Sequence, residues 1–146
     1  MSQKLLSMRD AIERFVPNGS TVLMGAGLES LIPFAAGHEI IRQGRRDLTL
    51  ARLTPDVIYD QMIAAGVARK LIFSWLGNPG VGGLNAIRRR IEDADPEPLE
   101  IEEYSPFGMV CRLSAGAANL PFWPLRNNAG TDIPKPNPAH KTVASP

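Results

Sequence analysis

Several features are scarce in this sequence, and each scarcity excludes a class of protein. The 146 residues include one cysteine, two histidines and 6% aromatic residues, and the net charge is +1. A lone thiol, Cys111, cannot form an internal disulfide, so we expect a buried, inert cysteine and a reducing compartment such as the cytoplasm. A net charge so close to zero gives no electrostatic reason to expect binding to nucleic acid or to a membrane surface.

Long apolar runs and metal-ligand spacings are also scarce. No stretch approaches the ~20 apolar residues that a membrane helix needs, and the first residues lack the apolar segment of a signal peptide. Neither His38 nor His140 has a cysteine or a second histidine at ligand spacing. We therefore expect a cytoplasmic protein without a metal site, a membrane anchor or a nucleic-acid partner.

Strand-like and helix-like segments alternate along the chain. Short apolar runs at 21–24, 48–53, 70–75 and 99–104 predict strands, and segments at 7–16, 33–43, 56–65, 84–93 and 107–120 predict helices. The alternation predicts an α/β fold with an open, mostly parallel sheet and helices on both faces. Residues 1–133 are expected to form this domain. The proline-rich residues 134–146 are expected to be a tail or a truncated continuation.

Two loops that follow predicted strands contain glycines. Gly25 and Gly27 do not fit the dinucleotide fingerprint, because Ser30 stands where its third glycine would fall. They form either a tight turn or a wall against a flat or thioester-bearing ligand. The loop 77–83 has four glycines but no closing Gly-Lys-Ser/Thr, so it is not a nucleotide phosphate loop. So many glycines favour a loop whose backbone faces a ligand over a purely structural turn.

Charged clusters have a structural and a functional interpretation. The run Arg88–Arg90 is expected to be a solvated helix face, although it would attract a phosphate if it flanked the glycine loop. Alternation in the strand at 99–104 places Glu103 on the face of Ile101, which should be the drier one. Glu103 is then either catalytic or paired with a buried partner such as Arg126.

At this point the sequence resembles a known family, the A (alpha) subunits of glutaconate-type CoA-transferases, within the family I CoA-transferases. The likeness runs in order over nearly the whole chain. It is carried by the segments 53–56, 73–82, 103–105, 120–126 and 130–132. The A subunits of this family usually continue well past the point where this chain stops, so the resemblance implies a fragment, a split gene product or a truncated chain.

The resemblance implies that CoA moves between an acyl-CoA thioester and a free carboxylic acid, with a dicarboxylic acid as the family's typical substrate. It implies a nucleophilic glutamate on a separate B subunit, hence a hetero-oligomer and no catalytic residue on this chain. CoA and acyl-CoA would be substrates, and no permanently bound cofactor is expected. This chain would line one wall of the cleft, with these substrate-binding residues: Gly25, Gly27, Asn78, Gly80, Gly82, Tyr104 and Ser105.

Other interpretations remain open. Relatives of this fold hydrolyse carbon–carbon bonds in CoA-linked ring compounds, which would require an acid or base from the cluster Glu100–Glu103. The chain could also be a non-catalytic assembly partner. Tyr104 and Ser105 end a predicted strand, where side chains often face a cleft, but Ser105 is equally suited to cap the following helix. Arg126 is a possible partner for a second substrate carboxylate.

Overall fold

A four-stranded parallel sheet forms the centre of the computed structural model, which describes residues 4–25, 27, 30–78, 80 and 82–144. The strands are β1 (Thr21–Leu23), β2 (Leu48–Ala51), β3 (Ala68–Phe73) and β4 (Glu100–Glu103), and they lie side by side in chain order. Each neighbouring pair is parallel. The predicted α/β fold with a parallel sheet is therefore confirmed.

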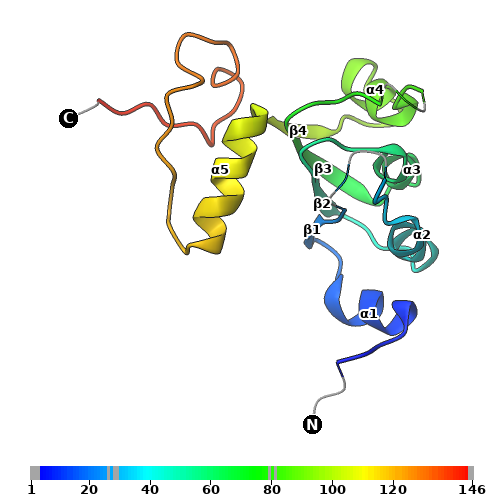
Figure 1. Ribbon diagram of the computed structural model, residues 1–146. Helices are drawn as coiled ribbons and strands as arrows, with labels where there is room; N and C mark the ends of the chain where they lie inside the picture. The colour runs from blue at the N-terminus through cyan, green and yellow to red at the C-terminus, as the bar shows by residue number, and fades with distance from the viewer. Residues whose placement is uncertain (1–3, 26, 28–29, 79, 81, 145–146) are drawn as a thin grey trace.

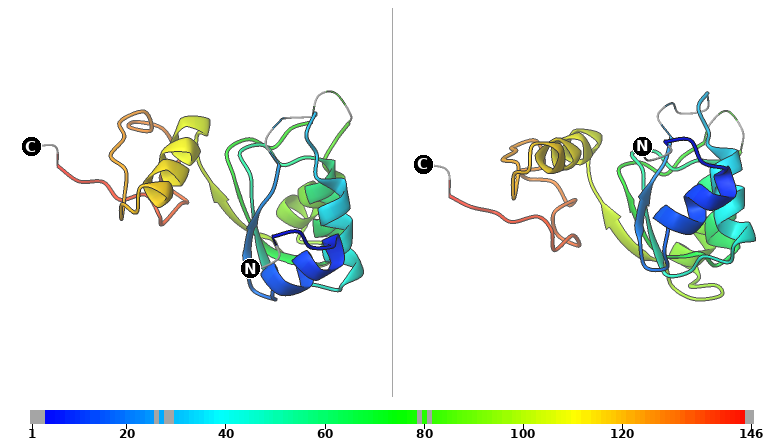
Figure 2. Two further views of the ribbon diagram at one scale, coloured as in Figure 1. Left: turned by 60° about the horizontal axis from the view of Figure 1, so that its bottom comes forward. Right: turned by 90° about the horizontal axis from the view of Figure 1, so that it is seen from below.

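Five helices accompany the described strands: α1 (Met8–Phe15), α2 (Phe34–Arg42), α3 (Val57–Ala64), α4 (Asn85–Glu92) and α5 (Pro106–Ala117). Parallel neighbours need crossover connections of one hand, so the connecting helices gather on one face of the sheet. Figure 1 and Figure 2 show α2, α3 and α4 on that face, whereas α5 lies on the opposite side. Local caps fix two helix starts, because Ser7 Oγ accepts the Asp10 amide and Asp56 Oδ1 accepts the Ile58 amide.

The core lies between the sheet and the helices α1 to α4. Leu50 and Leu71 point to this side from neighbouring strands and are fully buried, together with Ile58 and Ile40 from the helices. Successive strand residues point to opposite faces, so Ala51, Ile72 and the residues near them form a smaller apolar cluster on the other side. That cluster consists of Ala51, Ile72, Tyr104 and Met109, with Leu53 packed against it.

The expected orientation of β4 is wrong. Ile101 is 44% exposed and Glu103 is also exposed, whereas Glu102 is buried at 8% exposure. The negative charge of Glu102 is balanced on the α5 side of the sheet, where its carboxylate pairs with Lys70 at 2.7 Å and with Arg112. Because β4 is the last strand of the described sheet, Ile101 has a neighbouring strand on one side only, where it lies beside Leu71 of β3.

The arginine run of α4 also differs from its expected solvated face. Arg90 is 3% exposed, and its guanidinium donates to the carbonyl oxygens of Ala68, Glu97 and Pro98 at 2.9 to 3.3 Å. It therefore fastens the turn before β4 to the start of β3. Arg88 does lie in solvent, where it pairs with Glu92. Cys111 is buried, as expected.

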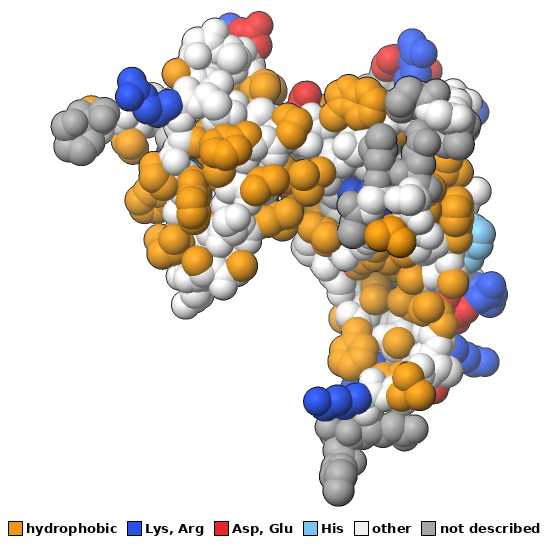
Figure 3. All heavy atoms as spheres, in the orientation of Figure 1, with side chains coloured by type: hydrophobic (Ala, Val, Ile, Leu, Met, Phe, Trp, Pro, Cys, Tyr) orange, Lys and Arg blue, Asp and Glu red, His pale blue; other side chains and the backbone are white. Residues whose placement is uncertain are grey.

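The chain after α5 runs through turns and has many exposed hydrophobic side chains. Asn137 Nδ2 ties this part to the sheet by donating to the Glu103 carbonyl at 2.7 Å. Figure 3 shows hydrophobic side chains gathered over α5 and the following segment. The exposed ones are Phe107, Val110, Leu113, Leu120, Phe122 and Trp123. Among the helices described here, none is long and apolar enough to cross a membrane.

Candidate functional site

Two loops with glycines rise from the carboxyl edge of the sheet. One follows β1 and contains Gly25 and Gly27, and the other runs from Ser74 to Leu84 between β3 and α4. Because all four strands are parallel, both loops emerge at the same edge, as Figure 2 shows. The crevice at this edge is where open α/β sheets commonly bind ligands.

A buried ion pair supports the loop after β1. Arg52 and Asp56 are 5% and 1% exposed and pair with each other, and Arg52 Nη2 also donates to the Gly27 carbonyl at 2.6 Å. Burial raises the pKa of the Asp56 carboxyl, and the charge of Arg52 opposes the rise. At Gly25, where φ is +86°, a Cβ would lie 2.8 Å from Arg52 Nη1. Glycine is therefore required here both for the backbone conformation and for the close approach of the guanidinium.

The hydroxyl of Tyr59 fixes the start of the same loop. It accepts the Met24 amide at 2.9 Å, and its one proton is shared between the carbonyl oxygens of Met24 and Ala51, each 3.0 Å away. Burial raises the pKa of Tyr59 to about 12, so the hydroxyl keeps its proton at neutral pH. The ends of β1 and β2 are thus held together directly beneath the loop.

A pocket of about 400 Å³ opens in the loop after β3. It is lined by Trp75, Gly77, Asn78, Gly82 and Gly83. Gly82 has φ +101° and open space where a Cβ would be, so backbone forms this part of the wall. The structure thus brings the expected residues Asn78 and Gly82 together. Trp75 was missed by the sequence reasoning, although a tryptophan directly before a glycine-rich loop was a usable signal.

The other expected residues lie around or away from this pocket. Gly25 and Gly27 belong to the loop after β1, and Gly80 is exposed between residues 79 and 81, which lie outside the described part. Tyr104 and Ser105 are at the end of β4, where Tyr104 is buried against α5 and bonds to Glu102. Burial raises the pKa of this Tyr104 hydroxyl. Ser105 caps α5 by accepting the Gly108 amide at 3.1 Å, which confirms its interpretation as a cap.

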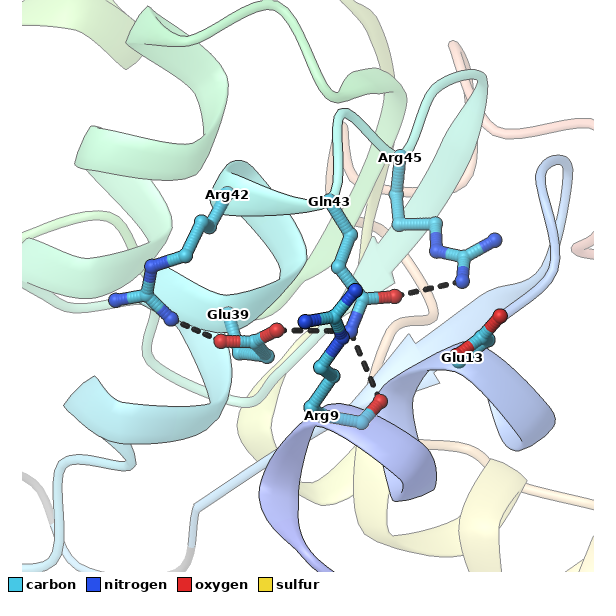
Figure 4. Close-up of a pocket in the computed structure, with 6 residues that line it drawn as sticks. All are labelled: Arg9, Glu13, Glu39, Arg42, Gln43 and Arg45. Atoms are coloured by element: carbon cyan, nitrogen blue, oxygen red, sulfur yellow. Dashed lines mark hydrogen bonds and ion pairs between the residues drawn. The ribbon is translucent and has the colours of Figure 1, made fainter.

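A larger, polar pocket of about 510 Å³ lies between α1 and α2, near the amino edge of the sheet. Its lining residues, drawn in Figure 4, are Arg9, Glu13, Glu39, Arg42, Gln43 and Arg45. Glu39 pairs with Arg42, and Gln43 bonds to Glu39, to the Arg9 carbonyl and to Arg45. These side chains mainly bond to one another, although Arg45 Nε is buried without a partner. The pocket at the carboxyl edge is the better candidate because open α/β sheets commonly bind ligands at that edge.

The family profile described as Coenzyme A transferase matches residues 5–143, which is nearly the whole chain. The chain belongs to the coenzyme A transferase family. Over 143 residues, this CoA-transferase chain is 52% identical to the A subunit of 3-oxoadipate CoA-transferase from Pseudomonas knackmussii. That match covers 98% of this chain and 50% of the Pseudomonas protein. The resemblance to A subunits that the sequence motifs indicated is therefore confirmed.

Two solved structures have a similar fold. Glutaconate coenzyme A-transferase from Acidaminococcus fermentans superposes with a TM-score of 0.81 and 28% identity, covering 91% of this CoA-transferase chain and 41% of its own. A variant of the decarboxylase AibA/AibB gives a TM-score of 0.79 and 26% identity, and the match covers 91% of this chain and 50% of the AibA/AibB chain. The chain thus spans half or less of the length of these relatives.

Proposed function

We propose that this chain is the A-type component of an enzyme that transfers CoA between an acyl-CoA thioester and a free dicarboxylic acid. The observation that carries the proposal is the 52% identity to its 3-oxoadipate CoA-transferase relative over 98% of the chain. Dicarboxylic acids of the 3-oxoadipate kind are accordingly the substrates we expect. The enzyme would work in the cytoplasm without a permanently bound cofactor.

In the proposed reaction, the B subunit provides a glutamate carboxylate that attacks the thioester carbonyl, and CoA leaves as the thiolate. The resulting acyl–glutamyl anhydride is attacked at its glutamyl carbonyl by that thiolate, which releases the first acid and leaves a glutamyl–CoA thioester. The acceptor carboxylate then reverses these two steps and leaves with CoA. Splitting one transfer into several acyl transfers is nucleophilic catalysis, and each tetrahedral intermediate needs hydrogen-bond donors for its oxyanion.

This chain would supply one wall of the cleft and backbone donors rather than the nucleophile. We assign the wall to Gly25, Gly27, Asn78, Gly80 and Gly82. The pocket beside the loop after β3 supports this role, since glycine lets the backbone approach a bulky thioester closely. Tyr104 and Ser105, at the same edge of the sheet, would border the cleft where β4 ends.

Isotope exchange tests the proposal with a single acid. The chain is co-purified with the B subunit of a 3-oxoadipate CoA-transferase, then incubated with unlabelled 3-oxoadipyl-CoA and carbon-14-labelled 3-oxoadipate. We expect label to enter the thioester, and we expect no exchange from the isolated B subunit. Stoichiometric release of free CoA without exchange would show thioester hydrolysis in place of transfer and would contradict the proposal. A stable complex that does neither would favour an assembly partner.

The acidic cluster provides a second discriminating test. If the nucleophile is on the B subunit, Glu100→Gln and Glu103→Gln should retain exchange, because both side chains lie in solvent at the edge of the sheet. Loss of activity in either variant, with the complex intact, would instead favour an acid or base on this chain. Glu102 is less informative, since its burial against Lys70 and Arg112 makes it a structural residue.

A further inference from the structure

Trp75 presents an aromatic surface to the pocket after β3. Its side chain lines the pocket and the residue is 47% exposed, unlike the buried β3 residues Ile72 and Phe73 that precede it. The backbone is anchored, because the amides of Ser74 and Trp75 both donate to the Leu53 carbonyl at 3.0 and 3.1 Å. A large apolar ring is thus held at the rim of an open pocket.

The absence of a side chain at Gly77 leaves room for the Trp75 ring. A Cβ built on Gly77 would overlap the Cη2 and Cζ2 atoms of Trp75, so the indole lies directly against the Gly77 backbone. The part of the ring around Cη2 and Cζ2 is therefore in contact with the loop, while the residue as a whole remains about half exposed. This arrangement suits a flat contact with a ligand in the pocket rather than a place in the core.

Asn78 lines the same pocket and carries an unpaired side-chain donor. The residue is 8% exposed, yet its amide nitrogen Nδ2 is buried and has no hydrogen-bond partner. Its backbone carbonyl is engaged separately, by the Gly82 amide at 3.2 Å. Buried side-chain donors are nearly always satisfied, so an unpaired one on a residue that lines a pocket points to an acceptor supplied by a ligand.

The uncharged lining of the pocket after β3 favours one part of a CoA ester over the others. The described lining residues carry no charge, which disfavours the phosphates of the nucleotide and the free carboxylate of the acid. The adenine ring is neutral, but its ribose carries phosphate groups on both sides. The pantetheine arm is uncharged, has an aliphatic chain, and offers amide and thioester carbonyls as acceptors.

We propose that Trp75 and Asn78 form a subsite for the pantetheine arm. The indole covers the aliphatic part of the arm, and Asn78 Nδ2 donates to one of its carbonyl oxygens. This inference rests on the proposed function, since it names the part of the CoA ester that this pocket holds. It assigns the two residues a binding role and no part in covalent chemistry.

The test uses the complete chain, because every residue of the subsite belongs to it. The chain contains two tryptophans, Trp75 and Trp123, so incorporation of fluorotryptophan gives two fluorine NMR signals, assigned with Trp75→Phe and Trp123→Phe. Trp123 is the internal control, because it lies in the segment after α5, on the opposite side of the sheet. Acetyl-pantetheine, which has no nucleotide, should shift the Trp75 signal and leave the Trp123 signal in place.

Asn78→Ala supplies the second readout. It removes a donor that has no partner in the free protein, so the urea midpoint of unfolding should not fall. Affinity for acetyl-pantetheine should nevertheless fall about fivefold, the effect of one neutral hydrogen bond. Loss of affinity with an unchanged midpoint supports a ligand contact, whereas unchanged affinity would overturn the role of Asn78.

The remaining outcomes separate this inference from the proposed function. A Trp75 signal that responds to an adenosine bisphosphate but not to acetyl-pantetheine would overturn the inference in favour of a nucleotide subsite. If calorimetry detects acyl-CoA binding while the Trp75 signal stays fixed, the inference fails and the proposed function stands. If no CoA ester binds to the chain or to its complex with the B subunit, both fail.

Discussion

Replacing Arg52 with methionine tests how the loop after β1 is supported. Arg52→Met keeps an unbranched apolar stem but leaves the Asp56 carboxylate buried at 1% exposure without its cation. Removing one partner of a buried ion pair typically costs about 3–5 kcal/mol. We expect the lower end, about 3 kcal/mol, because Asp56 Oδ1 still accepts the Ile58 amide at 3.1 Å. Urea denaturation at neutral pH measures the loss in the free energy of unfolding.

The double variant Arg52→Met/Asp56→Asn is the matched control. It removes the buried charge together with its partner, so it should be more stable than Arg52→Met by about 1–2 kcal/mol. Both variants lose the hydrogen bond to the Gly27 carbonyl, so acyl-CoA should bind more weakly to both, although only one is severely destabilised. A double variant no more stable than the single one would refute the buried-charge argument. Unchanged affinity in the double variant would refute the role of Arg52 in supporting the loop.

Three further predictions concern the sheet and its surfaces. The pKa of Tyr59 is raised from 10.0 to about 12, so its contribution to stability is complete below pH 10 and is lost as the pH rises through 12. Between pH 9 and pH 11, the free energy of unfolding measured by urea denaturation should fall by about 1.4 kcal/mol more in the wild type than in Tyr59→Phe. Equal losses in the two proteins would contradict this. Arg90→Met should lower the free energy of unfolding by about 2–3 kcal/mol, because it leaves buried carbonyl oxygens unpaired. The exposed control Arg88→Met should change it by no more than about 0.5 kcal/mol. Equal effects of the two substitutions would contradict the burial of Arg90. The chain alone should self-associate through the exposed hydrophobic side chains of α5 and the segment after it, and Leu113→Lys with Phe122→Ser should reduce the sedimentation coefficient. A monomeric parent chain would count against this.

The order of elements could be predicted from the sequence because each signal is local. Ser7 and Asp56 cap the helices that begin next to them, and Gly44 and Gly66 directly follow the last residues of α2 and α3 and their C-caps. Four apolar segments separated by helices then leave few arrangements other than a parallel sheet. The pocket after β3 could be anticipated in part, since the density of glycines indicated a backbone wall.

What the sequence could not predict depends on contacts between distant segments. Alternation showed that Glu102 and Ile101 lie on opposite faces of β4, but not which face would be covered. Lys70 on β3 and Arg112 on α5 decide that question, and neither is near Glu102 in the chain. Arg90 looked like part of a solvated run because its acceptors, Ala68 and Pro98, are brought to it only by the fold.

The most direct test of the central claim is a crystal structure of this chain in complex with acyl-CoA and the B subunit. The account predicts that the pantetheine arm lies in contact with Trp75 and Asn78, with the thioester facing the cleft between the two chains. A thioester bound away from the loop after β3, with that pocket filled by hydrophobic side chains of either chain, would contradict it.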